Sequence, residues 1–214
     1  MEHKVSNVGV LDKSVAVLSA VAAGPCSLAE LVDRTGLSRA TAHRLATALE
    51  DHGLLRRTDD GRFALGLHLV ALGRAAAEQY PLADAARPAL GELRAGTGES
   101  VQLYVVDGES RVCVAALESP HGLRTIVQVG SALPLDRGSA GRVLTGTVGK
   151  YGWVETVEER EPGVASVSAP VAGPDGSVVA AVSVSGPIDR MGRAPGKKYG
   201  AAVVAAAAAV AARL

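Results

Sequence analysis

Residues 38–49, SRATAHRLATAL, place basic and hydroxyl-bearing side chains at helical spacing. On a helix of about 3.6 residues per turn, Ala42, Leu45 and Leu49 share one side. The opposite side carries Arg39, Ala40, His43, Arg44 and Thr47. An arginine on such a surface can pair with guanine O6 and N7, and hydroxyls can contact phosphates. The pattern therefore favours recognition of a DNA major groove.

The elements that would position this helix can be read on both sides of it. SLAE at residues 27–30 fits a capping box that starts one helix, and Ser38 can cap the next, which runs to Gly53. Gly36 and Leu37 supply the short turn between them, as in a helix-turn-helix. Contacts to DNA are expected from the start of the second helix, at Ser38, Arg39, Ala40, Thr41, His43, Arg44 and Thr47.

A hairpin follows at once in LLRRTDDGRFAL, residues 54–65. An Asp-Asp-Gly turn joins two short strand-like runs, which is a hairpin signal. Arg62 stands just past the turn, where a phosphate would lie beside the recognition helix. We therefore expect Arg62 to join the DNA contacts.

A further helix is predicted ahead of the pair, over residues 10–24, with a glycine stop. Its apolar stripe consists of Leu11, Val15, Leu18 and Val21 or Ala22. Three short helices and a hairpin make a winged helix-turn-helix, a DNA-binding domain that we assign to residues 1–66.

Charge in this region is uneven, although the whole chain has a formal net charge of zero. A nucleic-acid binder needs positive charge concentrated locally. Between residues 34 and 74 the basic residues are Arg34, Arg39, Arg44, Arg56, Arg57, Arg62 and Arg74, and the acidic ones are Glu50, Asp51, Asp59 and Asp60. The alternative to DNA binding is a solvated surface helix, since every amphipathic helix exposes charge.

The rest of the chain predicts a linker helix over residues 67–81 and an α+β domain over residues 82–214. In the first helical run of that domain, Pro88 should kink the helix or mark a break. From Glu99 onward, β-rich runs alternate with Gly, Ser or Asp turns: SVQLYVVDG, RVCVAALES, LRTIVQVG and VASVSAPVAGPDGSVVAAVSVSG. These runs predict an antiparallel sheet flanked by helices. Aromatic residues make up only 3% of the chain, so its cores must be built from Ala, Val and Leu.

Cys26 and Cys113 lie far apart and form no metal-ligand spacing. They predict two reduced, partly buried thiols, with a redox switch at Cys26 as the alternative. No charged-then-apolar signal segment opens the chain, and AAVVAAAAAVAARL is too short and too Ala-rich to span a bilayer. We expect a cytoplasmic protein with no metal, cofactor or membrane contact.

Taken together, these stretches resemble the IclR family of bacterial transcription regulators. LAELVDRTGLSRATAHRLATALEDHGLLRR is similar to that family's helix-turn-helix, and GRFALG to its wing exit. GLRTIVQVGSALPL, EREPGVASVSAPV and AAVSVSGP are similar to its effector-domain signatures. GVLDKSVAVLSAV and QLYVVDGESRVCVAALE look closest to the actinobacterial NdgR/LtbR type, which controls leucine and other amino-acid biosynthesis genes.

The resemblance implies a GAF-like effector-binding domain, a homodimer on a palindromic promoter site, and in some members a dimer of dimers. It also implies an effector pocket lined by Ser139, Ala140, Gly141, Ser166, Ser183 and Ser185. Backbone amides of a Gly/Ser loop and inward hydroxyls can hold a small carboxylate, such as an amino acid or a keto acid. The alternative for Ser183 and Ser185 is the polar face of a sheet edge.

The chain departs from the family pattern near this pocket. Members with small-acid effectors often carry an acid at the position of Thr156 and a cysteine at that of Ser166, and both are replaced here. SAGRVLTGTVGKYGWVET is also short, because the family places helices between the SAG loop and the next strand. Either the protein has lost that excursion or the sequence as given omits a lid, and the intact flanking motifs favour omission.

Two other classes of function compete with a DNA-binding regulator. An enzyme is disfavoured because the chain carries no nucleophile-elbow, Walker or zinc pattern, and His68 and His121 have no partner spacing. The second rival is a small-molecule sensor whose helix-turn-helix serves mainly dimerisation or protein docking. Loss of DNA binding on replacing Arg44 would argue against that sensor.

Overall fold

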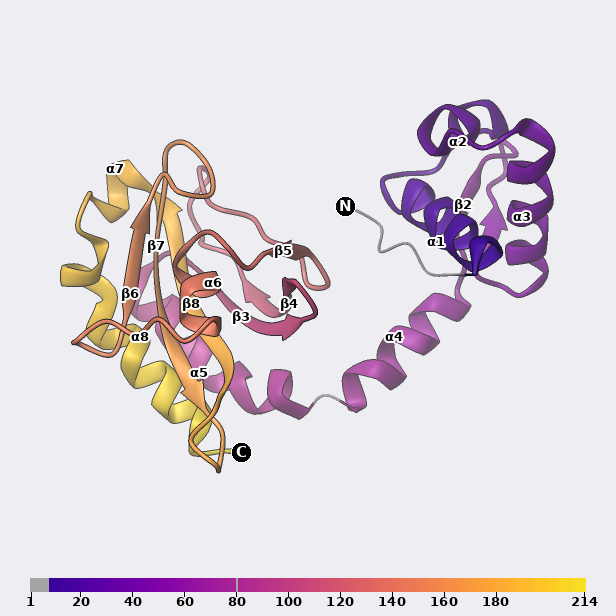
Figure 1. Ribbon diagram of the computed structural model, residues 1–214. Helices are drawn as coiled ribbons and strands as arrows, with labels where there is room; N and C mark the ends of the chain where they lie inside the picture. Colours follow the sequence, from indigo (N-terminus) through magenta and orange to yellow (C-terminus); the bar gives the residue numbers. More distant parts are fainter. Residues whose placement is uncertain (1–7, 80) are drawn as a thin grey trace. The chain divides into compact units, whose positions relative to one another are not determined.

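The computed structural model describes residues 8–79 and 81–214. The chain divides between residues 79 and 80 into two compact units, each with its own buried core (Figure 1). Within the described ranges, no helix is long and apolar enough to cross a membrane.

The first unit is a winged helix-turn-helix, as the sequence predicts. Its elements are α1 (Gly9–Ala22), α2 (Leu28–Thr35), α3 (Arg39–Asp51), β1 (Leu55–Arg57), β2 (Phe63–Leu65) and α4 (His68–Glu78). Strands β1 and β2 form a two-stranded antiparallel sheet. In Figure 1, α1, α2 and α3 gather around this hairpin, and α4 leaves the unit as a separate helix.

Local capping chemistry determines where α2 and α3 begin. The Ser27 hydroxyl accepts from the Glu30 amide at 3.3 Å, and the Glu30 carboxylate accepts from the Ser27 amide at 2.7 Å, so the predicted capping box is confirmed. These bonds to Ser27 hold the pKa of the Glu30 carboxyl below its ordinary value. Gly36 ends α2 at a φ of 66°, a left-handed conformation that favours glycine. The Ser38 hydroxyl caps α3 by accepting from the Thr41 amide at 3.3 Å.

The apolar stripe predicted for the first helix is wrong in its first half. Val17 and Val21 of α1 are buried, but Leu11 and Val15 are 55% and 42% exposed. This helix carries apolar residues on more than one side, so periodicity alone could not choose the side that meets the core. The buried side packs against Leu31 and other core residues of this unit, including Leu45, Leu49, Leu55 and Phe63.

The exit of the wing depends on two glycines in close contact. A Cβ on Gly66 would lie 2.0 Å from the carbonyl oxygen of Gly53, so only glycine fits there. Gly53 itself has a φ of 69°. The Gly66 amide donates to the Leu54 carbonyl at 2.9 Å. This contact explains the glycine that closes the GRFALG motif.

The second unit is an antiparallel sheet flanked by helices, as predicted. Its elements are α5 (Pro81–Thr97), β3 (Ser100–Asp107), β4 (Ser110–Leu117), β5 (Ala132–Pro134), α6 (Ser139–Leu144), β6 (Val154–Val157), β7 (Val164–Ala172), β8 (Val178–Pro187), α7 (Ile188–Met191) and α8 (Pro195–Ala211). The six-stranded sheet has the order β5-β4-β3-β8-β7-β6, and every pair is antiparallel. Helix α5 continues through Pro88, so the alternative of a break there is wrong.

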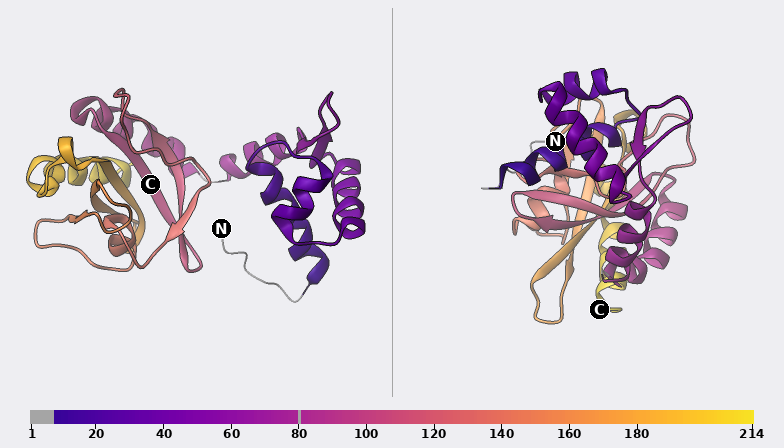
Figure 2. Two further views of the ribbon diagram at one scale, coloured as in Figure 1. Left: turned by 90° about the horizontal axis from the view of Figure 1, so that it is seen from above. Right: turned by 90° about the vertical axis from the view of Figure 1, so that its right-hand side faces the viewer.

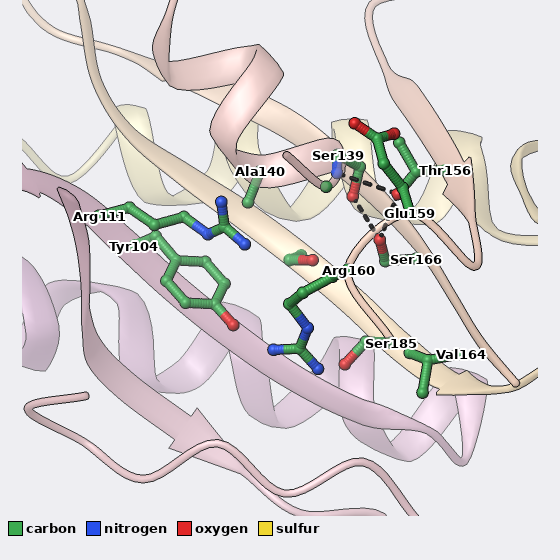
Figure 3. A pocket seen from close by; sticks show the side chains of 12 residues that line it. Tyr104, Arg111, Ser139, Ala140, Thr156, Glu159, Arg160, Val164, Ser166 and Ser185 are labelled. Atoms are coloured by element: carbon green, nitrogen blue, oxygen red, sulfur yellow. Dashed lines mark hydrogen bonds between the residues drawn. The ribbon is translucent and has the colours of Figure 1, made fainter. Parts of the chain in front are cut away.

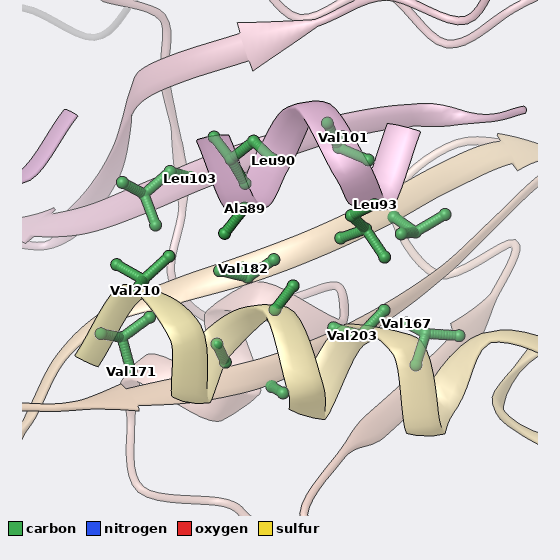
Figure 4. Packing of buried hydrophobic residues seen from close by; sticks show 14 of the residues in the cluster. Ala89, Leu90, Leu93, Val101, Leu103, Val167, Val171, Val182, Val203 and Val210 are labelled. Carbon is green, nitrogen blue, oxygen red and sulfur yellow. The ribbon is translucent and has the colours of Figure 1, made fainter. Parts of the chain in front are cut away.

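Helices α5 and α8 lie side by side on one face of this sheet (Figures 1 and 2). Their aliphatic side chains meet Leu103 of β3, Val167 of β7 and Val182 of β8 (Figure 4). The core is built from Ala, Val and Leu with few aromatics, as the composition requires. The opposite face carries the short helix α6 and a smaller cluster around Tyr104, Cys113 and Val143.

The strand predicted in LRTIVQVG, residues 123–130, is wrong. Thr125 and Val127 are buried while Ile126 and Val129 are exposed, an alternation typical of a strand, yet the segment is irregular. The edge of β4 that it could have joined is taken instead by β5. The β-rich composition of this run therefore predicted a strand for which no free edge of β4 remains.

The connection from α6 to β6 is short and ends on Trp153, whose indole packs on α8. A Cβ on Gly196 or Gly200 would lie 2.1 or 2.4 Å from indole atoms, so this pair of glycines, one turn apart, makes the groove that holds the ring. The Glu155 carboxylate accepts from the Gly196 amide at 2.6 Å and ties β6 to the same end of the helix.

We expect Gly200→Ala to lower the free energy of unfolding by about 1–3 kcal/mol, because the new methyl group overpacks the indole groove. Trp153 is the single tryptophan of the chain, so its emission spectrum should shift in the native state as the ring is displaced. Urea unfolding followed by tryptophan fluorescence measures both effects.

Gly91→Ala is the matched control, since Gly91 also lies inside a helix and no atom stands within 4 Å of the place that its new methyl group would take. That variant should be neutral or more stable by about 0.5–1 kcal/mol. Equal stabilities and identical spectra for the two variants would contradict close packing of the Trp153 indole against Gly200.

Candidate DNA-binding surface and effector pocket

Helix α3 exposes the basic residues that the sequence singled out. Arg39, His43 and Arg44 are exposed, while Ala42, Leu45 and Leu49 are buried against the rest of the unit. In the part of the chain that the structure describes, no ion pair or hydrogen bond engages the side chains of Arg39, His43 or Arg44. Their charges and donors are thus available to a partner outside the unit.

The other residues of this helix predicted to contact DNA differ in exposure and in hydrogen bonding. Ala40 is exposed, but Thr47 is half-buried. The hydroxyls of Ser38 and Thr41 bond to each other at 2.9 Å across the first turn of α3. Both still lie at the start of the helix, beside Arg39.

Arg62 has a structural role that the sequence did not reveal. Its Nη2 donates to the Glu30 carboxylate at 2.9 and 3.0 Å and to the Pro25 carbonyl at 3.0 Å. The wing is held here further by backbone hydrogen bonds between Cys26 and Phe63, at 2.8 and 3.0 Å. Arg62 therefore fastens the wing to the start of α2 and is not a free phosphate contact in this structure.

Some arginines of the first unit are held by contacts within the protein, and others are exposed to solvent. The Arg34 guanidinium donates to the carbonyls of Ala20 and Gly24 at 2.9 and 3.1 Å, at the end of α1. The Arg57 guanidinium lies 3.7 Å from the centre of the Phe63 ring and also pairs with a carboxylate of α3. Arg56 on β1 is exposed and, among the described residues, has no partner. Arg39, His43, Arg44 and Arg56 thus belong to the basic surface that α3 and the wing leave available.

The second unit holds a polar hollow on the sheet face opposite α5 and α8. Its lining residues are Tyr104, Arg111, Gly138, Ser139, Ala140, Thr156, Glu159, Arg160, Val164, Ser166, Ser183 and Ser185. All the residues predicted for an effector pocket line this hollow except Gly141, which follows Ala140 in α6. The cavity itself measures about 20 Å³, room for about one water molecule, so a larger ligand requires the lining side chains to move apart.

Strand register explains why serines far apart in sequence meet here. Ser166 on β7 stands opposite Ser185 on β8 and opposite Thr156 on β6, and Ser168 stands opposite Ser183. Strand β8 is central and its two serines are 3% and 5% exposed, so the alternative of a solvated sheet edge is wrong. Alternation along β8 sends Val182 and Val184 to the helices and the serines to the hollow.

Hydrogen bonds connect these hydroxyls to the start of α6 (Figure 3). The Ser139 hydroxyl lies 2.7 Å from the hydroxyls of Ser166 and Ser168, and its amide donates to the Thr156 hydroxyl at 3.1 Å. Ser168 in turn donates to Ser183 at 2.9 Å. This network fixes the SAG loop on the sheet and leaves rotatable hydroxyls facing the hollow.

Gly141 supports the pocket from behind. A Cβ there would lie 2.3 Å from the Leu135 carbonyl oxygen and 2.6 Å from Nη1 of Arg111, so any side chain would push α6 away from the sheet. The glycine therefore sets how close α6 approaches Arg111.

Arg111 is one of the pocket residues that sequence reasoning missed, with Tyr104, Glu159 and Arg160. Its side chain is 3% exposed overall, and its Nη1 donates to the backbone carbonyls of Pro134 and Arg137. Its guanidinium lies 5.4 Å from the centre of the Tyr104 ring. Within the run RVCV, Arg111 and Cys113 occupy alternate positions, so an inward Cys113 could have signalled an inward arginine.

The two cysteines show no sign of activation. Both are free thiols and fully buried. Burial raises the pKa of Cys26 above its ordinary value and that of Cys113 to about 11. Both thiols thus stay protonated near neutral pH, which does not favour the redox switch at Cys26.

Comparisons with known proteins match both units. Residues 10–59 match the IclR helix-turn-helix domain. Residues 74–148 and 146–212 match the C-terminal domain of the bacterial transcriptional regulator IclR. The two stretches of the second match meet inside the short connection between α6 and β6.

Curated relatives include KipR of Bacillus subtilis, 32% identical over 131 residues that cover 61% of this chain and 52% of that protein. The glycerol operon regulatory protein of Streptomyces griseus is 28% identical over 221 aligned positions, covering 86% of this chain and 87% of that protein. That alignment is longer than the 214 residues of this chain, so the relative carries residues that are absent here.

A solved structure of an IclR homologue from Microbacterium hydrocarbonoxydans, complexed with 4-hydroxybenzoate, superposes with a TM-score of 0.80. It covers 96% of this chain and 98% of that chain at 20% identity, which speaks for the fold. With both of its units matched, the protein belongs to the IclR family of bacterial transcriptional regulators, in which a helix-turn-helix unit binds DNA and the C-terminal unit binds an effector.

Proposed function

We propose that this regulator binds palindromic promoter DNA as a homodimer, and that a small molecule in the pocket of its second unit modulates that binding. The observation that carries the proposal is the exposed basic face of α3, at Arg39, His43 and Arg44, which has no partner among the described residues. A second helix of a helix-turn-helix places such residues against base edges and phosphates. Ser38, Ala40, Thr41 and Thr47 would flank them, with Arg62 acting by holding the wing in place.

Exposed apolar side chains of the first unit support the homodimer. On α1, Val10 is 62% exposed, in line with the exposed Leu11 and Val15. At and within α4, Leu67 and Val70 are 78% and 68% exposed. Solvent-facing aliphatic groups of this size mark association surfaces when they gather on the same elements. A dimer of dimers through the second unit stays a prediction.

The assignment of roles to segments follows from this division. Residues 1–66 would bind DNA, residues 67–81 would form the linker that transmits the signal, and residues 82–214 would bind the effector. The ligand can shift DNA affinity only if it binds the DNA-competent and incompetent arrangements with different affinity. The linker helix is the covalent route between the two units. With no transmembrane helix among the described residues, a cytoplasmic site of action fits this role.

We propose that the effector contacts Ser139, Ala140, Ser166, Ser183 and Ser185, with Gly141 setting the shape of the loop. The buried, inward hydroxyls and the backbone of the SAG loop can orient a small polar molecule. A relative solved with 4-hydroxybenzoate supports a small organic ligand.

Control of leucine or other amino-acid biosynthesis genes stays a prediction that rests on the resemblance to the NdgR/LtbR type. A relative is named for a glycerol operon, so family membership leaves the regulated genes open. Selection of operator sequences from random duplexes, followed by a genome search for the selected palindrome, identifies the target genes. Operators upstream of other pathways alone would contradict the prediction.

Arg44→Ala should weaken binding to the selected operator by about 1–3 kcal/mol per half-site, because a guanidinium contact to a base or phosphate is lost. Fluorescence anisotropy over a range of salt concentrations measures the affinity. Arg87→Ala is the control, since Arg87 lies exposed on α5 in the second unit. If Arg44→Ala binds like wild type, the helix-turn-helix serves docking or dimerisation instead.

Ser185→Val should abolish the response of operator binding to the effector while leaving ligand-free operator affinity unchanged. Ser185 is 5% exposed on the pocket floor, and the substitution replaces its hydroxyl, which donates to Gln102 at 3.1 Å, with two methyl groups. Ser177→Val, in the exposed turn between β7 and β8, is the matched control. A full effector response in Ser185→Val would place the effector elsewhere.

A further inference from the structure

The wing, formed by β1, β2 and the turn between them, carries three arginines, and two of them are engaged within the first unit. Arg62 pairs with the Glu30 carboxylate of α2 at 2.9 Å, and Arg57 pairs with the Glu50 carboxylate of α3 at 3.4 Å. Arg56 is exposed and, among the described residues, has no partner. The uncompensated positive charge of the wing therefore lies on Arg56.

Strand alternation directs Arg56 away from the core. Leu55 is 1% exposed and packs in the core of the unit, and the Arg57 guanidinium lies 3.7 Å from the centre of the buried Phe63 ring. Successive side chains of a strand point to opposite faces, so Arg56 leaves β1 on the outer face. Its guanidinium can thus meet a partner outside the unit.

Strand β1 borders the basic face of α3. Glu50 follows His43 by seven positions, about two helical turns, so these two residues share one side of the helix with Arg39. The Arg57–Glu50 ion pair joins β1 to that side. The pair also neutralises a carboxylate that would otherwise repel a phosphate beside α3. A duplex that meets α3 on this side therefore also comes close to β1.

The tip of the wing carries the opposite charge. Asp59 and Asp60 are both exposed, and no basic side chain in the described part of the chain forms an ion pair with either. A hydrogen bond from the Thr58 hydroxyl lowers the pKa of the Asp60 carboxyl, so this group stays ionised at neutral pH. Two uncompensated carboxylates at the tip repel the phosphates of a duplex.

The spacing along the hairpin separates the two kinds of charge. Asp59 follows Arg56 by three residues, and a strand rises about 3.3 Å per residue, so their backbones lie up to about 10 Å apart. That distance is close to the Debye length of about 8 Å at physiological ionic strength. A phosphate can therefore pair with Arg56 while the carboxylates of the tip stay screened from the duplex. Entry of the tip into a groove would instead place two anions against phosphates.

We propose that the wing binds the DNA backbone from the side of β1, through Arg56, and that its acidic tip is held off the duplex. Arg57 and Arg62 are positioning residues, which hold the hairpin against α3 and α2 and make no phosphate contact. The inference rests on the proposed binding of DNA by α3, and it assigns the part of the wing that takes part.

Binding of the full chain to the selected operator over a range of salt concentrations tests the role of Arg56. Arg56→Ala should lower the slope of log affinity against log salt concentration by about 1 for each half-site, because one phosphate contact is lost. Arg87→Ala on α5 is the control and should keep the wild-type slope. An unchanged slope in Arg56→Ala overturns the inference.

A double variant tests whether Arg62 acts only by holding the wing. Arg56→Ala combined with Arg62→Met should have the slope of Arg56→Ala alone, even where a displaced wing lowers the affinity further. A further loss of about 1 for each half-site would make Arg62 a phosphate contact and overturn its positioning role.

Asp59→Asn tests the position of the tip, because it removes one exposed charge that has no partner among the described residues. We expect operator affinity at physiological salt to change by less than about threefold, since the charge is screened at this distance. Glu109→Gln, in the exposed turn between β3 and β4 of the second unit, is the control. An increase beyond threefold in Asp59→Asn, with none in Glu109→Gln, places the tip against phosphates and overturns the inference.

Arg44→Ala separates failure of this inference from failure of the proposed function. If Arg44→Ala weakens operator binding while Arg56→Ala keeps the wild-type salt slope, the inference fails and DNA binding by α3 stands. If neither variant changes operator binding, the proposed function and the inference both fail.

Discussion

Ser168 on β7 donates to Ser183 on β8. The Ser139 hydroxyl, at the start of α6, hydrogen-bonds to both Ser166 and Ser168. This hydroxyl network lies on the inner face of a sheet whose other face is covered by the aliphatic side chains of α5 and α8. Strand β8 is buried on both sides, so each of its polar side chains must find a partner within the protein. The network satisfies that requirement and fixes α6 over the sheet, and a polar hollow remains between them. The pocket is thus a consequence of how the second unit buries its central strand.

The pocket face of the same sheet explains how the fold accommodates the buried Arg111 side chain. Most side chains on the pocket face are small, so space is left for a long side chain from β4. Gly141 permits the guanidinium to lie against α6, and the carbonyls of Pro134 and Arg137 hold one of its nitrogens. The protein neutralises Glu159 with Arg142 and, among the described residues, gives Arg111 no carboxylate.

The sequence predicts the first unit well because its boundaries depend on local chemistry. The Ser27–Glu30 capping box, the Ser38 cap and the left-handed Gly36 can all be read from residue types within a few positions. Tertiary contacts decide the features that the sequence did not reveal. Arg62 bonds to Glu30, which lies 32 residues earlier in the sequence. Packing of the core buries Val17 of α1 and leaves Leu11 exposed. Neither the Arg62–Glu30 contact nor the buried side of α1 can be read from a short stretch of sequence.

The pocket was predictable in part through the family resemblance, which brought the serines of separate strands together. Register confirms their shared location, since Ser166 stands opposite Ser185 and Ser168 opposite Ser183. Tyr104, Glu159 and Arg160 could not be placed without the fold, because contacts between distant segments bring them to the pocket. The irregular course of residues 123–130 depends likewise on β5 having taken the edge of β4.

The central claim is that the DNA-binding face of α3 and the pocket of the second unit act on one equilibrium. Thermodynamic linkage tests it directly, because an effector that changes operator affinity by some factor must have its own affinity changed by operator DNA by the same factor. Titrating the effector into the full chain with and without saturating operator gives one factor, and titrating operator with and without saturating effector gives the other. The account predicts equal factors, of about 5- to 150-fold for a typical coupling. An effector affinity that is identical with and without operator DNA would contradict it.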